Sequence, residues 1–256
     1  MCIRDRSSGT TNSKSKFIPV SNESLEDCHY AAGKDLLCMY LSNNPNSQLF
    51  TGKSLRLGGS KTPYEKNGTF YGDLSAILID NMPFWAEFSS TPSNKTSLME
   101  DWDYKMVAII NETLNENVTS LAGVPSWMLV LLNKILKESK KEYISEIWPN
   151  LEVYFHGGVS FKPYLNQYDA IINKDSMQYY EIYNASEGFF AIQYENNSNE
   201  LLLMLDYGIF YEFIPMKTYG TKNEKIIPLS QVEKGVNYAI LITTNAGLWR
   251  YKIGDT

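Results

Sequence analysis

The segment from Val118 to Leu136 reads VTSLAGVPSWMLVLLNKIL and indicates a strand followed directly by an amphipathic helix. The strand is expected at Val118–Leu121, where a short apolar and β-branched run ends at a glycine. Pro125 suits the first helical turn, where its missing N–H leaves no hydrogen bond unmade. Helical spacing then gathers one apolar face, formed by Met128, Leu129, Leu132, Ile135 and Leu136. Because a second strand is expected at 151–155, this part of the chain is predicted to be α/β.

The same alternation extends in both directions from this unit. Further strands are expected at residues 16–20 and 55–57, and further helices at 23–41, 73–79, 98–114 and 163–172. From residue 178 the pattern becomes β-rich, with candidate strands at 178–183, 188–193, 201–206, 210–214, 237–243 and 248–253. We therefore predict an α/β fold with mixed sheets flanked by helices. It divides into an α/β portion at 7–177 and a β-rich portion at 178–256, which is expected to form its own sheet or barrel-like subdomain.

Composition limits the classes of function. The chain has 256 residues, is 43% hydrophobic and 20% charged, and carries a formal net charge of -6. This is an ordinary globular composition, and its acidic balance argues against a nucleic-acid partner. No apolar run is long enough to span a membrane, and the N-terminal residues lack the apolar core of a signal peptide. Three cysteines without a C-x-x-C pair favour free thiols in a reducing cytoplasm, and two distant histidines make a histidine-based zinc site improbable.

The first candidate site is a loop rich in hydroxyl groups, which consists of Ser7, Ser8, Gly9, Thr10 and Thr11 and continues towards Lys14 and Lys16. Such a loop can turn backbone N–H groups and hydroxyls onto phosphate oxygens. It is not a Walker A loop, because G-x-x-x-x-G-K-[ST] is absent and a strand is expected after it. Taken alone, this loop is more often a solvated linker.

Three further candidates stand near expected strand ends. Glu187 lies in a turn between two strands, where a lone carboxylate can ligate Mg²⁺. Gly157 and Gly158 would let a ligand approach the backbone closely. Asp255 ends the segment WRYKIGD and could accept two hydrogen bonds from a ribose diol. For each of them alone, an ordinary turn is the alternative interpretation.

The order of these motifs along the chain resembles that of the adenylate-forming superfamily, which includes acyl-CoA synthetases. Within it, the chain is more similar to the auxin-responsive acyl-acid amido synthetases, the Gretchen Hagen family of plants and its bacterial relatives. Three stretches carry this resemblance: SSGTT at 7–11 continuing into KSKFIPV at 14–20, YNASEGFF at 183–190, and LWRYKIGD at 248–255. The resemblance implies that the chain is the central portion of the large N-terminal domain of such an enzyme.

The resemblance also implies roles for single residues. The loop at 7–11 would cradle the phosphates of ATP, and Gly157-Gly158 would lie along the adenosine. Tyr183 matches the aromatic side chain that packs on the adenine. Ser186 would help to hold the α-phosphate, Glu187 matches the glutamate that binds Mg²⁺, and Asp255 matches the aspartate that binds the ribose.

The implied reaction joins a small carboxylic acid to an amino acid. The carboxylate attacks the α-phosphorus of ATP, pyrophosphate leaves, and an amine then attacks the acyl-adenylate to give an amide and AMP. An apolar acyl pocket is expected near Val124 and Trp127, with core packing as the alternative at this position. Two other functions stay open: a thioester-forming acid–CoA ligase of the same superfamily, and a non-catalytic nucleotide-binding module.

Both ends of the chain depart from the family pattern. Residues 1–6 read MCIRDR, fit no expected element, and are interpreted as non-native sequence that replaces the strand before Ser7. The small C-terminal domain of the family, whose lysine completes the adenylation site, does not follow Asp255. We therefore expect little or no adenylation by the polypeptide as written.

Overall fold

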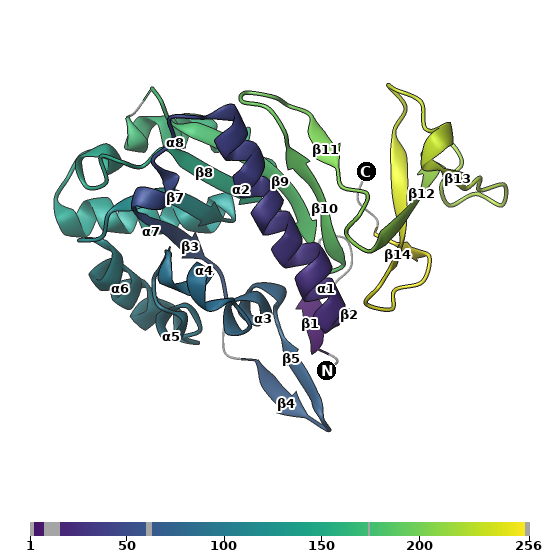
Figure 1. The fold of residues 1–256 in the computed structure, drawn as a ribbon, viewed down its shortest axis with the longest axis horizontal. Coiled ribbons are helices and arrows are strands. Elements are labelled where there is room, and N and C mark those ends of the chain that lie inside the picture. The colour runs from purple at the N-terminus through teal and green to yellow at the C-terminus, as the bar shows by residue number, and fades with distance from the viewer. Residues whose placement is uncertain (1–2, 8–15, 60–62, 174, 254–256) are drawn as a thin grey trace.

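A seven-stranded mixed sheet forms the centre of the computed structural model, which describes residues 3–7, 16–59, 63–173 and 175–253 (Figure 1). The strand order is β11-β10-β9-β8-β7-β3-β6. Pairing is parallel from β6 to β9 and antiparallel from β9 to β11. The strands are β3 (Lys53–Leu57), β6 (Ser90–Thr91), β7 (Val118–Gly123), β8 (Val153–Gly157), β9 (Gln178–Ala185), β10 (Gly188–Gln193) and β11 (Leu201–Leu203). The predicted fold class is confirmed.

Helices cover both faces of this sheet. On one face α6 (Trp102–Thr113), α7 (Pro125–Ser139) and α8 (Leu165–Ile172) enclose a buried cluster around Leu121 and Tyr154. On the other face α2 (Ala31–Asn43) crosses the sheet (Figure 1) and packs Leu36 and Tyr40 against Phe155. Because β8 is buried along its whole length, its sequence is a nearly continuous apolar run. None of the helices in the described ranges is long and apolar enough to cross a membrane.

Helix α7 forms as the opening segment predicts. Pro125 occupies the start of the helix, and the apolar face is buried at Met128, Leu132 and Ile135. The chain leaves the helix at Lys140, which adopts a left-handed conformation with φ 55°. Lys137 lies in the last turn, where a cation complements the helix dipole.

Two four-stranded sheets flank the central one. The first has the order β2-β1-β5-β4 and consists of β1 (Ile3–Ser7), β2 (Lys16–Val20), β4 (Tyr64–Lys66) and β5 (Thr69–Gly72). The expectation that residues 1–6 fit no element is wrong, because Ile3–Ser7 pair with β2 antiparallel and with β5 parallel. A strand therefore leads into the predicted phosphate loop. The non-native origin of residues 1–6 stays a prediction.

The second flanking sheet has the order β13-β12-β14-β15 and is antiparallel throughout (Figure 1, yellow). Its strands are β12 (Ile209–Pro215), β13 (Ile227–Pro228), β14 (Tyr238–Thr244) and β15 (Tyr251–Lys252). Tyr211, Phe213 and Ile242 share one buried cluster with Phe190 of β10, so this sheet packs against the central one. The chain changes sheet after β11, whereas the predicted division into domains at residue 178 stays a prediction.

Local chemistry shifts several element boundaries from their expected positions. The helix expected at 98–114 begins only at Trp102, because the Asp101 side chain accepts the Tyr104 N–H at 3.0 Å and caps it. The helix expected at 23–41 contains a short α1 (Asn22–Ser24) and a π-helical segment, Leu25–Tyr30, before α2. The expected helix at 73–79 is α3 (Leu74–Asp80), whereas α4 (Phe84–Phe88) and α5 (Asn94–Ser97) were not expected.

The loop after β3 is held from inside the protein by a buried lysine. Lys105 of α6 is 2% exposed, and its ammonium group donates to the carbonyl oxygens of Gly58, Gly59 and Ser97, at 3.1 Å to Gly58 and 2.6 Å to Ser97. Burial lowers the pKa of Lys105, although Asp73 nearby partly opposes this. The Gly59 N–H donates to Ser75 Oγ at 2.7 Å, so the loop is fixed on both sides of its backbone.

We predict that Lys105→Met lowers the free energy of unfolding by about 1–3 kcal/mol, because it leaves three carbonyl groups without their donor. Urea denaturation followed by circular dichroism measures this. The matched control is Lys34→Met on the exposed side of α2, which should change stability by less than about 0.5 kcal/mol. Equal effects of the two variants would contradict the assigned role of Lys105.

Candidate functional site

The carboxyl ends of β3, β7, β8 and β9 lie at one edge of the central sheet, because these strands are parallel neighbours. In open α/β sheets this edge is the usual place for a ligand. Val124 follows β7 and Gly158 follows β8, and a Cβ placed on Gly158 would lie 3.5 Å from Val124 Cγ2. The structure therefore brings together a residue predicted for the acyl pocket and one predicted for the adenosine.

The two glycines at the end of β8, Gly157 and Gly158, are required for different structural reasons. A Cβ on Gly157 would lie 2.5 Å from the carbonyl oxygen of Ile182 in β9, so close strand packing alone requires glycine there. Gly158 has φ 81°, a backbone conformation that other residues rarely adopt. Gly157 is buried and Gly158 is exposed. Of the two, Gly158 is thus the one that a ligand can reach.

The motif from Tyr183 to Gly188 forms the turn between β9 and β10. Ala185 and Gly188 are cross-strand partners, so Ser186 and Glu187 form the tip, where both are partly exposed. The Tyr183 ring packs on Phe190, with centroids 4.9 Å apart. A Cβ on Gly188 would lie 2.7 Å from Ile209 Cδ1 of β12, so glycine lets the second flanking sheet approach this turn.

Three segments that are far apart in the sequence meet beside this turn. The ammonium group of Lys16 at the start of β2 donates to the Tyr251 hydroxyl of β15 at 3.1 Å and lies 5.4 Å from the centre of the Tyr251 ring. The hydrogen bond to Tyr251 raises the pKa of Lys16, and the nearby Glu187 carboxylate adds to this effect. The strand that follows the hydroxyl loop therefore contacts the WRYKIGD strand, and the Glu187 carboxylate is near enough to act electrostatically on Lys16.

Lys16 closes the first candidate stretch and Tyr251 lies in the last one, but the sequence analysis assigned a role to neither of them. Both stand inside the motifs, since Lys16 follows the hydroxyl loop and Tyr251 precedes Asp255. Ser7 is the last residue of β1 and the cross-strand partner of Lys16. Ser8, Gly9, Thr10, Thr11 and Asp255 lie outside the described residues, so their roles stay predictions.

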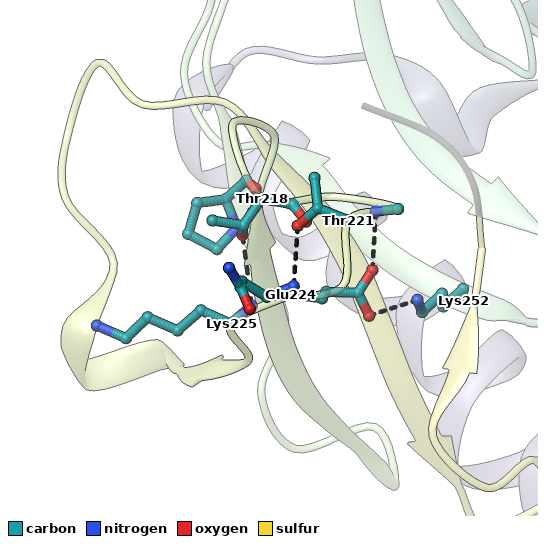
Figure 2. Close-up of polar contacts among 8 residues, drawn as sticks. Thr218, Thr221, Glu224, Lys225 and Lys252 are labelled. Carbon is teal, nitrogen blue, oxygen red and sulfur yellow. Dashed lines mark hydrogen bonds and ion pairs between the residues drawn. The ribbon is translucent and has the colours of Figure 1, made fainter.

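The two basic residues of the WRYKIGD segment both have carboxylate partners. Arg250 donates two hydrogen bonds to Glu212, at 2.9 and 2.8 Å. Lys252 pairs with Glu224 at 2.5 Å and lies over the Tyr219 ring, 5.4 Å from its centre. Figure 2 shows Glu224 between Lys252 and the backbone of its own loop, where it also accepts the Gly220 N–H at 3.0 Å.

The same loop is closed by hydroxyl groups (Figure 2). The Lys225 N–H donates to Thr218 Oγ1 at 3.4 Å, and the Asn223 N–H donates to Thr221 Oγ1 at 3.3 Å. These contacts, with the Glu224–Lys252 pair, hold the loop against β15. Arg250 and Lys252 thus stabilise the position of the strand that carries Tyr251.

The region predicted for the acyl pocket contains an exposed aromatic pair. Trp127 in the first turn of α7 is 54% exposed and packs edge to face on Trp102 of α6, with ring centroids 4.9 Å apart. Val124 is partly buried. Trp127 is therefore not a core residue, and the role of both side chains in binding an acid stays a prediction.

A single carboxylate is available for a metal ion at the turn. The described part of the chain contains no group of three or more His, Cys, Asp or Glu side chains that could hold a metal ion. Glu187 at the tip is partly exposed and close to Lys16. This arrangement fits Mg²⁺, which is commonly bound by one or two carboxylates together with substrate phosphates and water.

His156 lies next to the glycine pair but is a poor proton donor or acceptor at neutral pH. It is 3% exposed, its ring stacks on Phe161 with centroids 4.1 Å apart, and its Nδ1 has no hydrogen-bond partner. Burial lowers the pKa of His156 to about 4. His29, which is also buried, has its pKa lowered to about 4 for the same reason. Both histidines are neutral at pH 7.

Comparison with solved structures defines the class of fold. The chain superimposes on an acyl acid amido synthetase of the GH3 type, AtGH3.15 in complex with 2,4-DB, with a TM-score of 0.76 and 16% identity. This match covers 99% of the present chain and 52% of the other. A long-chain-fatty-acid-CoA ligase from Archaeoglobus fulgidus gives a TM-score of 0.51 at 12% identity, with 93% of this chain and 41% of the other covered. The fold is thus that of the adenylate-forming enzymes.

Matches to models of protein families identify the family within this class of fold. Residues 5–177 match the GH3 family N-terminal domain, and residues 202–256 match the GH3 family central domain. The chain belongs to the GH3 family, the auxin-responsive acyl-acid amido synthetase family that its motifs resemble. It is 27% identical over 264 residues to indole-3-acetic acid-amido synthetase GH3.4 of Arabidopsis thaliana, a match that covers 96% of this chain and 40% of the relative. The chain therefore spans less than half the length of that relative.

We predict that His156→Phe reduces the loss of stability at acid pH. A folded-state pKa of about 4, against 6.5 for the ordinary group, means that the unfolded chain binds more protons between these values. Stability therefore falls as the pH drops from 6.5 to 4, by up to about 1.4 kcal/mol per pH unit for each histidine. Urea denaturation at several pH values should show a shallower slope for the variant. An unchanged slope would contradict the lowered pKa of His156, because His29 is present in both proteins and contributes equally to both slopes.

Proposed function

We propose that this chain forms the ATP-binding portion of an enzyme that activates a carboxylic acid as an acyl-adenylate and transfers the acyl group to an amino acid. The observation that carries the proposal is the contact of Lys16 with Tyr251, which raises the pKa of Lys16, with the Glu187 carboxylate near enough to add to this effect. These residues come from three different motifs, and the first and the last of them lie near opposite ends of the chain. Motifs that are distant in sequence but adjacent in the fold are expected when one ligand contacts all of them.

Each part of the proposed site is assigned to one part of the ATP molecule. The loop from Ser7 to Thr11 contacts the phosphates, and Ser186 holds the α-phosphate. Tyr183 packs on the adenine, Gly158 follows the adenosine while the buried Gly157 lets β8 and β9 pack closely beneath it, and Asp255 accepts hydrogen bonds from the ribose. Tyr183 and Gly158 suit these roles because they lie on neighbouring strand ends of the central sheet.

The reaction needs positioning and neutralisation of charge more than covalent chemistry. The substrate carboxylate attacks the α-phosphorus, the bond to the β-phosphate oxygen breaks, and pyrophosphate leaves with that electron pair. The amino group then attacks the acyl carbon, loses a proton, and displaces AMP. Hydroxyl and N–H donors stabilise the charge that builds on the phosphate oxygens. When bound at Glu187, Mg²⁺ would offset part of the negative charge on the same oxygens.

The acid is proposed to lie near Val124 and Trp127. Val124 borders Gly158, so a group beside Val124 is also beside the proposed adenosine. Trp127 and Trp102 offer aromatic surface. Several relatives are named indole-3-acetic acid-amido synthetases, so an aromatic acid of this type is a suitable probe.

Isothermal titration calorimetry with ATP and Mg²⁺ tests the nucleotide site in this chain. Binding is expected, and its absence at millimolar ATP would contradict the proposal. In a full-length enzyme that contains this segment, mass spectrometry of products formed with indole-3-acetic acid, ATP and either amino acids or CoA tests the acceptor. An amide is expected, whereas a CoA thioester would favour the acid–CoA ligase instead.

We predict that Glu187→Gln weakens binding of ATP in the presence of Mg²⁺ by about 10- to 100-fold, because it removes the proposed carboxylate ligand. Titration without Mg²⁺ should show a much smaller difference between variant and parent. Glu195→Gln is the matched control, since Glu195 is an exposed glutamate in the loop after β10. Loss of affinity that is the same with and without the metal ion would argue against a metal-binding role for Glu187.

A further inference from the structure

Two buried tyrosines hold the short segment that joins β7 to α7. The Tyr154 hydroxyl of β8 donates to the carbonyl oxygen of Gly123 at 2.9 Å. The Tyr168 hydroxyl of α8 donates to the carbonyl oxygen of Pro125 at 2.7 Å. The residue between these two carbonyl groups is Val124. Two separate elements of the fold therefore hold the backbone on both sides of Val124.

The start of α7 has no capping side chain that could hold this segment instead. Val124 is the N-cap residue, where a serine, threonine or aspartate would usually accept a backbone N–H, and no side chain does so here. Pro125 has no N–H that could bind a neighbouring group. The Val124 carbonyl oxygen accepts the Met128 N–H at 3.1 Å, a bond within the helix itself. The two tyrosine hydroxyls thus anchor the segment to the rest of the fold.

The hydroxyl groups of Tyr154 and Tyr168 lie in an apolar core, where they need these partners. Both rings are completely buried and stack with centroids 5.2 Å apart, in the cluster that contains Leu121. Phenylalanine would fill the same space, whereas a buried hydroxyl costs free energy unless it is hydrogen-bonded. Burial raises the pKa of both phenols, so each keeps the proton that it donates. Tyr179, which packs against the same cluster, donates to Asp169 at 2.8 Å instead.

The held segment borders the proposed acid site. A Cβ on Gly158 would lie 3.5 Å from Val124 Cγ2, so the Val124 side chain is at contact distance from the proposed adenosine position. On its other side, a Cβ on Gly123 would lie 2.7 Å from the carbonyl oxygen of Leu57, so β3 and β7 end close together. Because a displacement of about 1 Å can strongly reduce the rate of an enzyme, the place of Val124 matters for an acid beside it.

We propose that the hydroxyl groups of Tyr154 and Tyr168 are positioning groups that set the place of Val124 and thereby the size of acid that the site accepts. The completely buried rings lie behind Val124 and act through it, without touching the acid. This inference rests on the proposed function and extends it, because it assigns selectivity for the acid to two residues of the core. Binding of ATP should not depend on them.

Hydrogen–deuterium exchange of the present chain tests the anchoring directly. In Tyr154→Phe and in Tyr168→Phe, a peptide that covers residues 122–130 should exchange about 3-fold faster or more, because one anchor of its backbone is lost. Tyr179→Phe is the matched control, since it removes a hydroxyl from the same packing group that binds Asp169 instead. Exchange that is equal in the parent and in both test variants would overturn the anchoring role.

Steady-state kinetics of a full-length enzyme that contains this segment tests the selectivity, with benzoic, phenylacetic and indole-3-acetic acids as probes. Tyr154→Phe and Tyr168→Phe should each raise the KM for the acid by about 3-fold or more, while kcat and the KM for ATP change by less than about 2-fold. The ratio of kcat/KM between the best and the poorest acid should fall by about 3-fold or more, because Val124 is no longer fixed. Tyr179→Phe should change none of these quantities.

The outcomes separate this inference from the proposed function. A parent enzyme that adenylates none of the three acids would contradict the proposed function and this inference with it. An active parent whose KM for the acid and selectivity are unchanged in both variants would overturn the role of the two tyrosines alone. Equal rises in KM for the acid and for ATP would show a general structural effect and would also overturn it. Thermal unfolding confirms that each variant is folded, and either variant alone is sufficient for the comparison.

Discussion

Parallel pairing of β3, β7, β8 and β9 is the constraint on which the rest of the structure depends. Each connection must carry the chain back to the end of the sheet at which the previous strand began. The carboxyl ends of these strands therefore all lie at the opposite edge. Val124, Gly158 and the turn at Glu187 are at this edge for that reason alone. Close strand contact then decides details such as the glycine at 157, where a side chain would meet the backbone of β9.

A second contact completes the candidate site. The sheet from β12 to β15 packs its apolar face against β10, and Gly188 lets Ile209 approach the Glu187 turn. This docking is what brings Tyr251 to Lys16. The Glu212–Arg250 and Glu224–Lys252 pairs are on the surface, where such pairs contribute little to stability, and their main effect here is to orient β15 and to neutralise two of three neighbouring cations.

Sequence patterns predicted elements best where several local signals agree. Helix α7 was predicted correctly because Pro125 and a continuous apolar face act together. The start of α6 was placed too early because the cap at Asp101 outweighs the apolar residues before it. The strand at Ile3–Ser7 was missed because its charged sequence has no strand pattern, and only pairing with β2 and β5 forms it.

The sequence by itself determined the fold class, the family and the motifs, because these depend on local periodicity and on the order of short segments. Glu187 and Gly158 could be named as candidates from such segments. Only the tertiary structure decided that Lys16 lies on Tyr251, that Arg250 and Lys252 are neutralised, and that Gly157 is required by packing. Those facts depend on contacts between strands that are far apart in the chain, and neither the spacing nor the type of the residues specifies them.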